Sequence, residues 1–119
     1  MTVYIDDMYR YTIGEFKGMK MSHMISDDEE ALHDMAARLG LRRAWHQGDH
    51  YDVPLDARAR AVRMGAVEIT YRQASPMRRR QVVEGRCGDP AEAIVWLKAW
   101  FAIRNSARNP SLSGASERP

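Results

Sequence analysis

The chain contains one cysteine and no long hydrophobic run. A single cysteine cannot form an internal disulfide, and the turn-like setting of Cys87, GRCGDP, favours an incidental thiol over a nucleophile. No apolar stretch approaches the roughly 20 residues that a membrane-spanning helix requires. The chain begins MTVYIDDM, with acids where a signal peptide carries basic residues. These absences predict a cytoplasmic protein with no membrane partner.

Familiar catalytic motifs are also missing. The sequence has no GxSxG elbow, no CxxC pair and no phosphate-binding loop of the Walker type. It contains no internal repeat either. Motifs therefore assign the chain to no common enzyme class, and any site must be inferred from scattered side chains.

The composition is that of one globular domain with unevenly distributed charge. The length of 119 residues suits a single domain, and a hydrophobic share of 45% suffices for one core. Residues 1–54 carry six Lys or Arg against ten Asp or Glu, whereas residues 55–119 carry twelve against six. The basic half could steer an anionic partner, or the two halves could simply attract each other.

Hydrophobic patterning predicts alternating strands and helices in the first part of the chain. β-branched and aromatic residues indicate strands, and the clearest helix has a capping box, Ser26 with Glu29, and a terminating Gly40. The predicted elements are, in order, strands at 2–6 and 19–26, a helix at 27–39, a strand at 41–45, a helix at 55–64 and a strand at 66–70.

This order predicts an α/β core domain over residues 1–73, with a small, mainly parallel four-stranded sheet and crossover helices. Residues 74–88 are arginine-rich and predict a mobile connection. A C-terminal apolar helix at 89–104 begins with DPAE and should pack on the core or on a dimer partner. Residues 105–119 are polar and predict a disordered tail.

Acidic and imidazole side chains follow the predicted strands. Asp6 and Asp7 follow the first strand, and His50 and Asp52 follow the third. Because the carboxyl ends of parallel strands meet at one edge of a sheet, we expect these side chains to lie close together. In an extended segment His50 and Asp52 project to the same side, where they could bind a divalent metal or act as an oriented general base. A hydrogen-bonded turn without a site is the competing interpretation.

Other polar and aromatic residues have structural interpretations beside functional ones. His33 borders the apolar stripe of its helix, where a packed histidine is more common than a catalytic one. Trp45 stands alone, which favours a pocket wall over a base-stacking platform. The run Arg78, Arg79 and Arg80 could grip phosphates, although such runs are usually solvated surface.

Five blocks of the sequence resemble one protein family. VYIDDM, MKMSHMISD, EALHDMAARLGLRRAWHQ, HYDVP and GAVEIT, in this order, resemble a bacterial and phage family designated domain of unknown function 4031 (DUF4031). The resemblance covers about residues 1–73 and implies a short intracellular protein, but it implies no particular reaction. The positions that share the family pattern are mostly polar: Asp6, Asp7, Ser22, His23, His33, Trp45, Gln47, His50, Tyr51 and Asp52.

The preferred hypothesis is a small hydrolase acting on a phosphate-containing substrate, a nucleotide or nucleic acid, with a His/Asp site and a divalent metal ion as its candidate cofactor. The alternative is a non-catalytic module that binds a nucleotide, a nucleic acid through Arg78, Arg79 and Arg80, or a partner protein, with a homodimer formed through the last helix. In the hydrolase hypothesis the catalytic residues are His23, His33, His50 and Asp52, the substrate-binding residues are Ser22, Arg42, Arg43, Trp45, Gln47 and Tyr51, and the metal ligands are Asp6, Asp7, His50 and Asp52.

Overall fold

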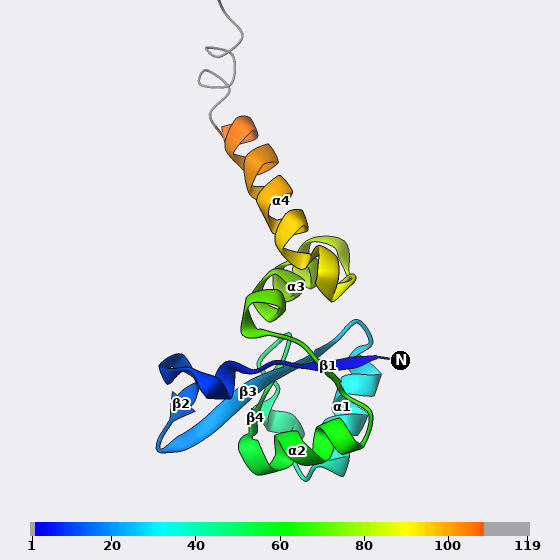
Figure 1. Ribbon diagram of the computed structural model, residues 1–119. Helices are drawn as coiled ribbons and strands as arrows, with labels where there is room; N and C mark the ends of the chain where they lie inside the picture. The colour runs from blue at the N-terminus through cyan, green and yellow to red at the C-terminus, as the bar shows by residue number, and fades with distance from the viewer. Residues whose placement is uncertain (1, 109–119) are drawn as a thin grey trace, which may run out of the picture.

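The computed structural model describes residues 2–108, which form a small sheet with helices on both faces (Figure 1). The strands are β1 (Val3–Ile5), β2 (Glu15–Phe16), β3 (Met19–Ser26), β4 (Tyr51–Pro54) and β5 (Val67–Glu68). The helices are α1 (Glu29–Arg38), α2 (Leu55–Arg63), α3 (Tyr71–Glu84) and α4 (Ala93–Arg108). Short 3-10 turns occur at Met8–Arg10, Thr12–Gly14, Arg43–Trp45 and Pro90–Glu92.

β3 is the strand around which the sheet is built. It pairs antiparallel with β1, β2 and β4, and among the described strands the one parallel pairing joins β1 to β5. The mixed α/β class is thus confirmed, but the prediction of a mainly parallel four-stranded sheet is wrong. The reason lies between β1 and β3, where two 3-10 turns and a hairpin replace a crossover helix, so the chain returns antiparallel.

The predicted strand at 41–45 is also wrong. Arg43–Trp45 form a 3-10 turn, and Arg42 to Trp45 are all exposed. A strand in this sheet needs one face to bury, and these residues offer none. The fourth strand forms later, at Tyr51–Pro54, where buried and half-buried residues alternate.

The helix predicted at 27–39 is present as α1, but its N-cap differs from the prediction. Asp28 Oδ1 accepts from the backbone N–H groups of Glu30 and Ala31, at 3.0 and 3.3 Å. Ser26 instead donates to the carbonyl of Thr2 at 2.6 Å, which ties the end of β3 to the start of β1. The helix predicted at 55–64 is confirmed as α2.

Helices cover the two faces of the sheet, with α1 and α2 on one side and α3 on the other (Figure 1). Because strand side chains alternate, Ile5, Met24 and Tyr51 pack against α1 and α2. Ile25 faces the opposite way and packs with Met77 of α3. Met24 and Ile25, which are adjacent in β3, therefore pack on opposite faces of the sheet.

α3 replaces the mobile connection that the sequence predicted for residues 74–88. Thr70 and Gln73 form a full capping box at its start, in which each side chain accepts from the other's backbone N–H. Pro76 lies inside the helix and is buried. The helix persists because Ala74 and Met77 are fully buried against the sheet, and this packing outweighs the missing N–H of the proline.

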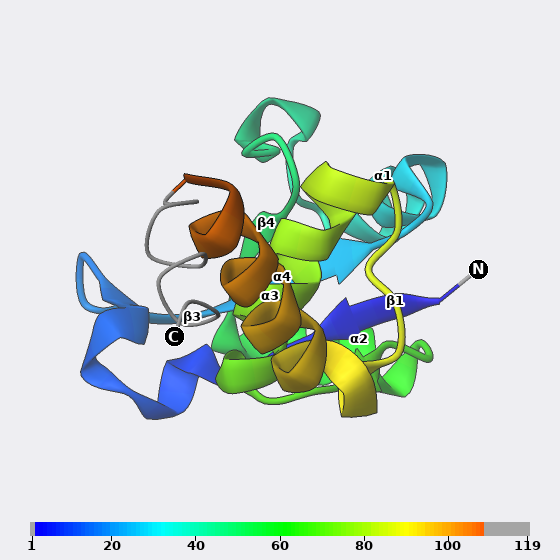
Figure 2. The same cartoon turned by 90° about the horizontal axis from the view of Figure 1, so that it is seen from above.

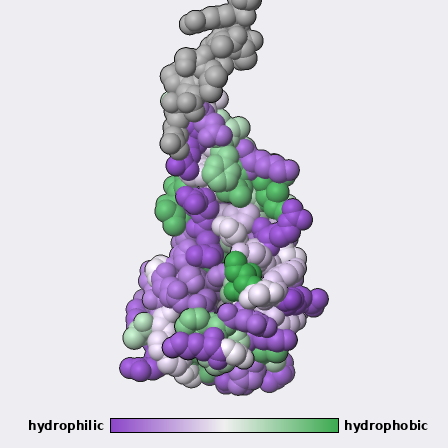
Figure 3. Space-filling view, turned by 90° about the vertical axis from the view of Figure 1, so that its left-hand side faces the viewer, coloured by the Kyte–Doolittle hydropathy of each residue, from purple (hydrophilic) through white to green (hydrophobic). Residues whose placement is uncertain are grey.

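α4 begins as predicted, with the Asp89 side chain accepting from the N–H of Ala91, and packs on α3 (Figure 2). Hydrophobic side chains remain exposed over α3 and α4 (Figure 3), with Val95 and Ile103 more than 70% exposed. The predicted disordered tail at 105–119 is helical as far as Arg108, and the rest of it lies outside the described residues. Within residues 2–108, no helix is both long and apolar enough to cross a membrane.

Gly14 lies where the chain between β1 and β2 folds closely on itself. A Cβ at this position would lie 2.2 Å from the backbone oxygen of Met8, which cannot move aside as a flexible side chain would. We expect Gly14→Ala to destabilise the fold by about 1–3 kcal/mol, the usual cost of overpacking. Chemical denaturation measures the loss, and the control is Thr12→Ala, a change at an exposed residue of the same 3-10 turn. Equal stability of both variants would show that this turn can open without cost.

Candidate functional site

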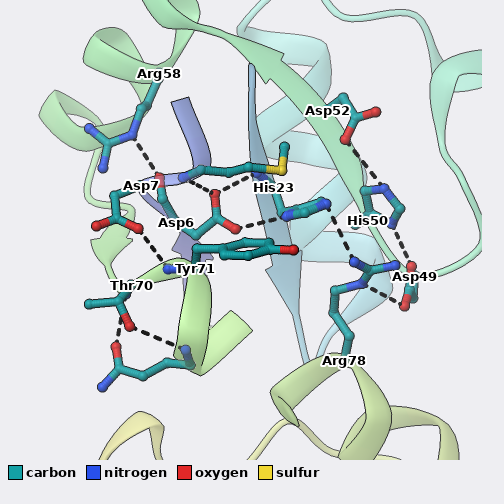
Figure 4. Close-up of polar contacts among 12 residues, drawn as sticks. Asp6, Asp7, His23, Asp49, His50, Asp52, Arg58, Thr70, Tyr71 and Arg78 are labelled. Carbon is teal, nitrogen blue, oxygen red and sulfur yellow. Dashed lines mark hydrogen bonds and ion pairs between the residues drawn. The ribbon is translucent and has the colours of Figure 1, made fainter. Parts of the chain in front are cut away.

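The site is a row of polar side chains across three adjacent strands on the α3 face of the sheet (Figure 4). His23 of β3 lies opposite Asp52 of β4 in the strand register, and the Asp6 N–H donates to the His23 carbonyl at 2.9 Å on the other side. Alternation explains why these residues share a face, because Met24, Tyr51 and Val53 between them point into the core. The row lies on the face of the sheet, not at the carboxyl ends of parallel strands as predicted.

Asp6 is fully buried and orients His23. Its Oδ1 accepts from the backbone N–H groups of Met8, at 3.0 Å, and His23, at 2.8 Å. Its Oδ2 lies 2.8 Å from His23 Nδ1. Arg58 donates to the Asp6 backbone carbonyl at 2.9 Å and so holds the turn from the α2 side. The carboxylate fixes both the position and the rotation of the imidazole ring.

Arg78 of α3 determines which nitrogen of His23 carries the proton. Its Nη1 lies 3.4 Å from His23 Nε2, and a guanidinium can only donate. His23 Nε2 must therefore accept, which places the ring proton on Nδ1, where it is donated to Asp6. The arrangement leaves a basic lone pair on Nε2, facing away from the buried carboxylate.

α3 is positioned so that two of its side chains reach this face. The Tyr71 N–H at its start donates to Asp7 Oδ1 at 2.6 Å. Tyr71 and Arg78 are seven residues apart, about two helical turns, and so project from the same side of the helix. The Tyr71 ring stacks on His23, with ring centroids 6.1 Å apart and planes 13° apart. Asp7 thus helps to hold the helix over the site.

His50 lies beside His23 and contacts two carboxylates. The imidazole centroids are 4.9 Å apart at an angle of 77°. His50 Nδ1 lies 2.5 Å from Asp49 Oδ1, and Nε2 lies 3.3 Å from Asp52 Oδ1. Arg78 Nε donates to the other oxygen of Asp49 at 3.1 Å, so a continuous chain of polar contacts runs from Asp6 to Asp52.

The same contacts shift the pKa values around His50. Burial lowers the pKa of His50, but its hydrogen bonds with Asp52 and Asp49 raise it by more, so its pKa lies above the ordinary value. The hydrogen bond from His50 is the main reason why the pKa of Asp52 is lowered. Burial raises the pKa of Asp49, but hydrogen bonds from His50 and Arg78 outweigh it and lower that pKa. The environment therefore favours an imidazolium at position 50 between two carboxylates.

A cavity of about 390 Å³ opens onto these side chains. His23, His50, Asp52, Tyr71 and Arg78 line it, together with residues from the β2 hairpin and the turns before it. This volume lies at the lower end of the range of small-molecule sites. Reactive nitrogens, a guanidinium and a carboxylate are therefore accessible to one small ligand.

Part of this cluster has metal-binding geometry. Ligand atoms of His23, His50 and Asp52 lie within 4.8 Å of one another, a set of two histidines and one carboxylate. The Arg78 guanidinium, however, occupies the space at His23 Nε2, where an ion would bind. The predicted ligands Asp6 and Asp7 do not join the set. Asp6 is engaged by His23 and Met8, and Asp7 accepts from the Tyr71 N–H.

Several predicted site residues lie elsewhere. Ser22 points to the opposite side of β3 from His23 and is buried, with no hydrogen-bond partner for its Oγ. His33 Nδ1 lies 2.6 Å from the Tyr51 hydroxyl, on the core side of β4. His33 therefore belongs to a second group, with Glu29 and His46, whose ligand atoms also lie within 4.8 Å of one another. The sequence prediction placed His33 in one site with His23, His50 and Asp52, and the alternation of β4 separates it from them.

The arginine run at 78–80 does not form one basic patch. Arg78 faces the histidines, whereas the Arg79 guanidinium lies 5.2 Å from the Trp100 ring centroid. Arg80 is buried, donates to Glu84 at 3.2 Å and lies over the ring of Trp96. Three successive helical residues point in directions about 100° apart, so the run divides among three environments. Arg42 and Arg43 are exposed and lie outside the residues that line the cavity.

Sequence reasoning missed the residues that α3 contributes, Tyr71 and Arg78. Two signals were present: the capping pattern Thr70 to Gln73, and the spacing of seven between tyrosine and arginine. Asp49 was also not among the predicted site residues, although it contacts both His50 and Arg78. Gly48 has a φ of +87°, and this turn brings the Asp49 carboxylate back against His50.

Cys87 is buried and does not take part in the site. Burial is the main cause that raises the pKa of its thiol, and the Asp27 carboxylate, which accepts from the Cys87 N–H, raises it further. The thiol therefore stays protonated, which agrees with an incidental cysteine.

The fold and the site define a small α/β protein with a histidine-containing cavity on one face of its sheet. Residues 3–81 match the family described as protein of unknown function (DUF4031), and the chain belongs to this family. The match continues past residue 73 into α3 and includes Arg78. No curated protein and no solved structure matches the chain.

His50 and His46 lie in environments that shift their pKa values in opposite directions. We expect His50 to titrate above about 6.5, the ordinary value, and His46 below it, because burial and His33 lower the pKa of His46. Ring-proton NMR across a pH series measures both midpoints in one sample, and Asp52→Asn should lower the midpoint of His50 alone. The stabilising contribution of His50 is complete below its unfolded pKa and is lost as pH rises through its folded pKa. A midpoint for His50 below that of His46 would contradict the assigned protonation.

Proposed function

We propose that this protein is a hydrolase of phosphate esters that uses its two histidines as an acid and a base. The observation that carries the proposal is one cavity lined by two adjacent imidazoles. Arg78 contacts His23 directly and also contacts Asp49, the carboxylate beside His50. One imidazole with a free lone pair beside another that can donate a proton is a usual arrangement for acid–base catalysis.

Arg78 is the proposed phosphate ligand. A guanidinium matches the geometry of phosphate oxygens and keeps its charge at all relevant pH values. The contact between Arg78 and His23 Nε2 is long, at 3.4 Å, and one carboxylate, Asp49, holds the Nε side of the guanidinium. A bound phosphate would take over the Nη1 contact and free the imidazole lone pair.

His23 is the proposed general base. Its Nε2 accepts the proton of a water molecule while the water oxygen forms a bond to phosphorus. Asp6 is a positioning residue that stabilises the imidazolium formed in this step, through the 2.8 Å contact with Nδ1. Because Asp6 is fully buried, its charge acts on His23 with little screening by water.

His50 is the proposed general acid. Its raised pKa favours the protonated ring, and the contact of Nε2 with Asp52, at 3.3 Å, is looser than that of Nδ1 with Asp49. As the bond from phosphorus to the leaving oxygen breaks, the Nε2 proton passes to that oxygen. The products are an alcohol and a phosphate ester or phosphate, and solvent returns one proton to His50 and takes one from His23.

This assignment predicts a large loss of activity when either histidine is replaced. We expect His23→Gln and His50→Gln each to lower hydrolysis of a dinucleoside phosphodiester, whose leaving alcohol oxygen needs a proton, by about 10²- to 10⁴-fold, the usual contribution of a proton-transfer group. His46→Gln, a histidine of the other group, is the matched control and should keep the wild-type rate. Arg78→Met should be impaired where Arg79→Met is not. Thermal melts establish that each variant is folded, and equal rates in wild type and both site variants would refute the proposal.

The position of Arg78 makes a second prediction, because a guanidinium beside His23 Nε2 disfavours a cation at the same place. We expect phosphodiester hydrolysis to survive exhaustive dialysis against a chelator, with a rate within about twofold of the untreated enzyme. Loss of activity that Zn²⁺ or Mn²⁺ restores would instead assign His23, His50 and Asp52 as metal ligands. Purified protein should correspondingly contain less than one equivalent of either metal.

A further inference from the structure

A second hollow, of about 540 Å³, adjoins the cavity that contains the histidines. The two hollows have lining residues in common, Phe16, Met21, Gln47 and Asp52. One molecule could therefore occupy both, with one part at His23 and His50 and another part in the neighbouring groove.

The groove has an apolar lining with exposed aromatic rings. Trp45 is 49% exposed, Phe16 is 55% exposed and Met19 is 46% exposed. Leu41, Ala44 and Pro54 complete the apolar wall, and Gln47 and Asp52 are its polar side chains. Large hydrophobic side chains gathered around one hollow usually mark a ligand site. Trp45, which stands alone in the sequence, thus shares its groove with a second aromatic residue.

The polar and charged groups at this groove suit a planar ligand attached to an anion. The Arg42 guanidinium lies 5.9 Å from the Trp45 ring centroid, and the Lys17 ammonium lies 5.3 Å from that of Phe16. Each of the two aromatic rings therefore has a cationic side chain next to it. Gln47 donates one N–H to Asp52 at 2.7 Å, and its amide has further donor and acceptor capacity for the edge of a ligand.

We propose that the groove binds the base of a nucleotide whose phosphate lies between the histidines and Arg78. This inference rests on the proposed phosphate site, because it assigns the groove to another part of the same substrate. A nucleobase combines flat faces for Trp45, hydrogen-bonding edges for Gln47 and a covalent link to phosphate. A lipid chain would leave Gln47 without a role, and a sugar phosphate has no flat π face to stack on Trp45.

Binding measurements test the base site without requiring turnover. Isothermal titration calorimetry compares the four ribonucleoside monophosphates with ribose phosphate, which has the same phosphate but no base. We expect at least one nucleotide to bind the wild-type protein about tenfold or more tightly than ribose phosphate, as stacking of a single base predicts. Trp45→Ala should remove this difference and leave the affinity for ribose phosphate unchanged.

Two further variants keep the test specific. Trp45→Phe retains an aromatic face and should keep most of the preference for the nucleotide. Phe101→Ala removes an aromatic residue of similar exposure, 40%, from α4 and should not change it. Circular dichroism melts of all variants show whether a lost affinity reflects the site or the fold.

The possible results separate the base site from the phosphate site. Equal affinity for nucleotides and ribose phosphate would overturn the base site while leaving the phosphoesterase proposal intact. Base-dependent binding without hydrolysis would support the groove and count against catalysis. Phosphotyrosine that binds as tightly as the best nucleotide, with the same dependence on Trp45, would overturn the assignment in favour of a phosphopeptide. Binding of none of these compounds at millimolar concentration would refute both proposals.

Discussion

The buried carboxylate of Asp6 is the interaction on which the rest of the site depends. It lies where β1 ends, accepts from two backbone N–H groups and contacts the imidazole of His23. An ionised carboxylate that is fully buried without partners would be very costly, and these three contacts compensate for the burial of Asp6. They fix the turn after β1, the pairing of that turn with β3 and the orientation of His23. One side chain thereby links the topology of the sheet to the chemistry of the cavity.

α3 supplies the part of the site that the strands do not contain, Arg78 and Tyr71. β3 and β4 supply His23 and Asp52, and His50 lies just before β4. The Nε2 atom of His23 contacts Arg78 only because α3 packs on this face. Asp7 holds the start of the helix, and Asp49 holds Arg78 two turns further on. The capping box at Thr70 starts the helix at the residue that makes this spacing work. A helix that began one residue later would rotate Arg78 by about 100° away from the imidazoles.

The sequence predicted the parts of the fold that depend on local patterns. β3, α1, α2 and the start of α4 follow from alternation, apolar spacing and caps. Strand direction did not follow, because it depends on whether a connection contains a helix, and the segment between β1 and β3 folds into short turns instead. α3 was missed because Pro76 and several arginines conceal an apolar side formed by few residues, Ala74 and Met77. Their helical state is stabilised by contacts with distant residues such as Ile25.

The same distinction holds for the site. Spacing alone predicts that His50 and Asp52 share a side, and they do. The position of Arg78 beside His23 depends on the packing of α3 against the sheet, which no local pattern encodes. The division of the predicted residues into two groups, around His23 and around His33, depends on which face of the sheet each strand residue points to.

The alternation of buried and cavity-lining residues along β4 restricts where the chain can gain or lose a residue. Tyr51 and Val53 are completely buried, while His50 and Asp52 on the other side line the cavity. Insertion or deletion of one residue between the Gly48 turn and Pro54 would reverse the two sides. An aromatic ring would then fill the place of the acid, and an imidazole would enter the hydrophobic layer. Variation in length is therefore expected to be rare within the strand itself.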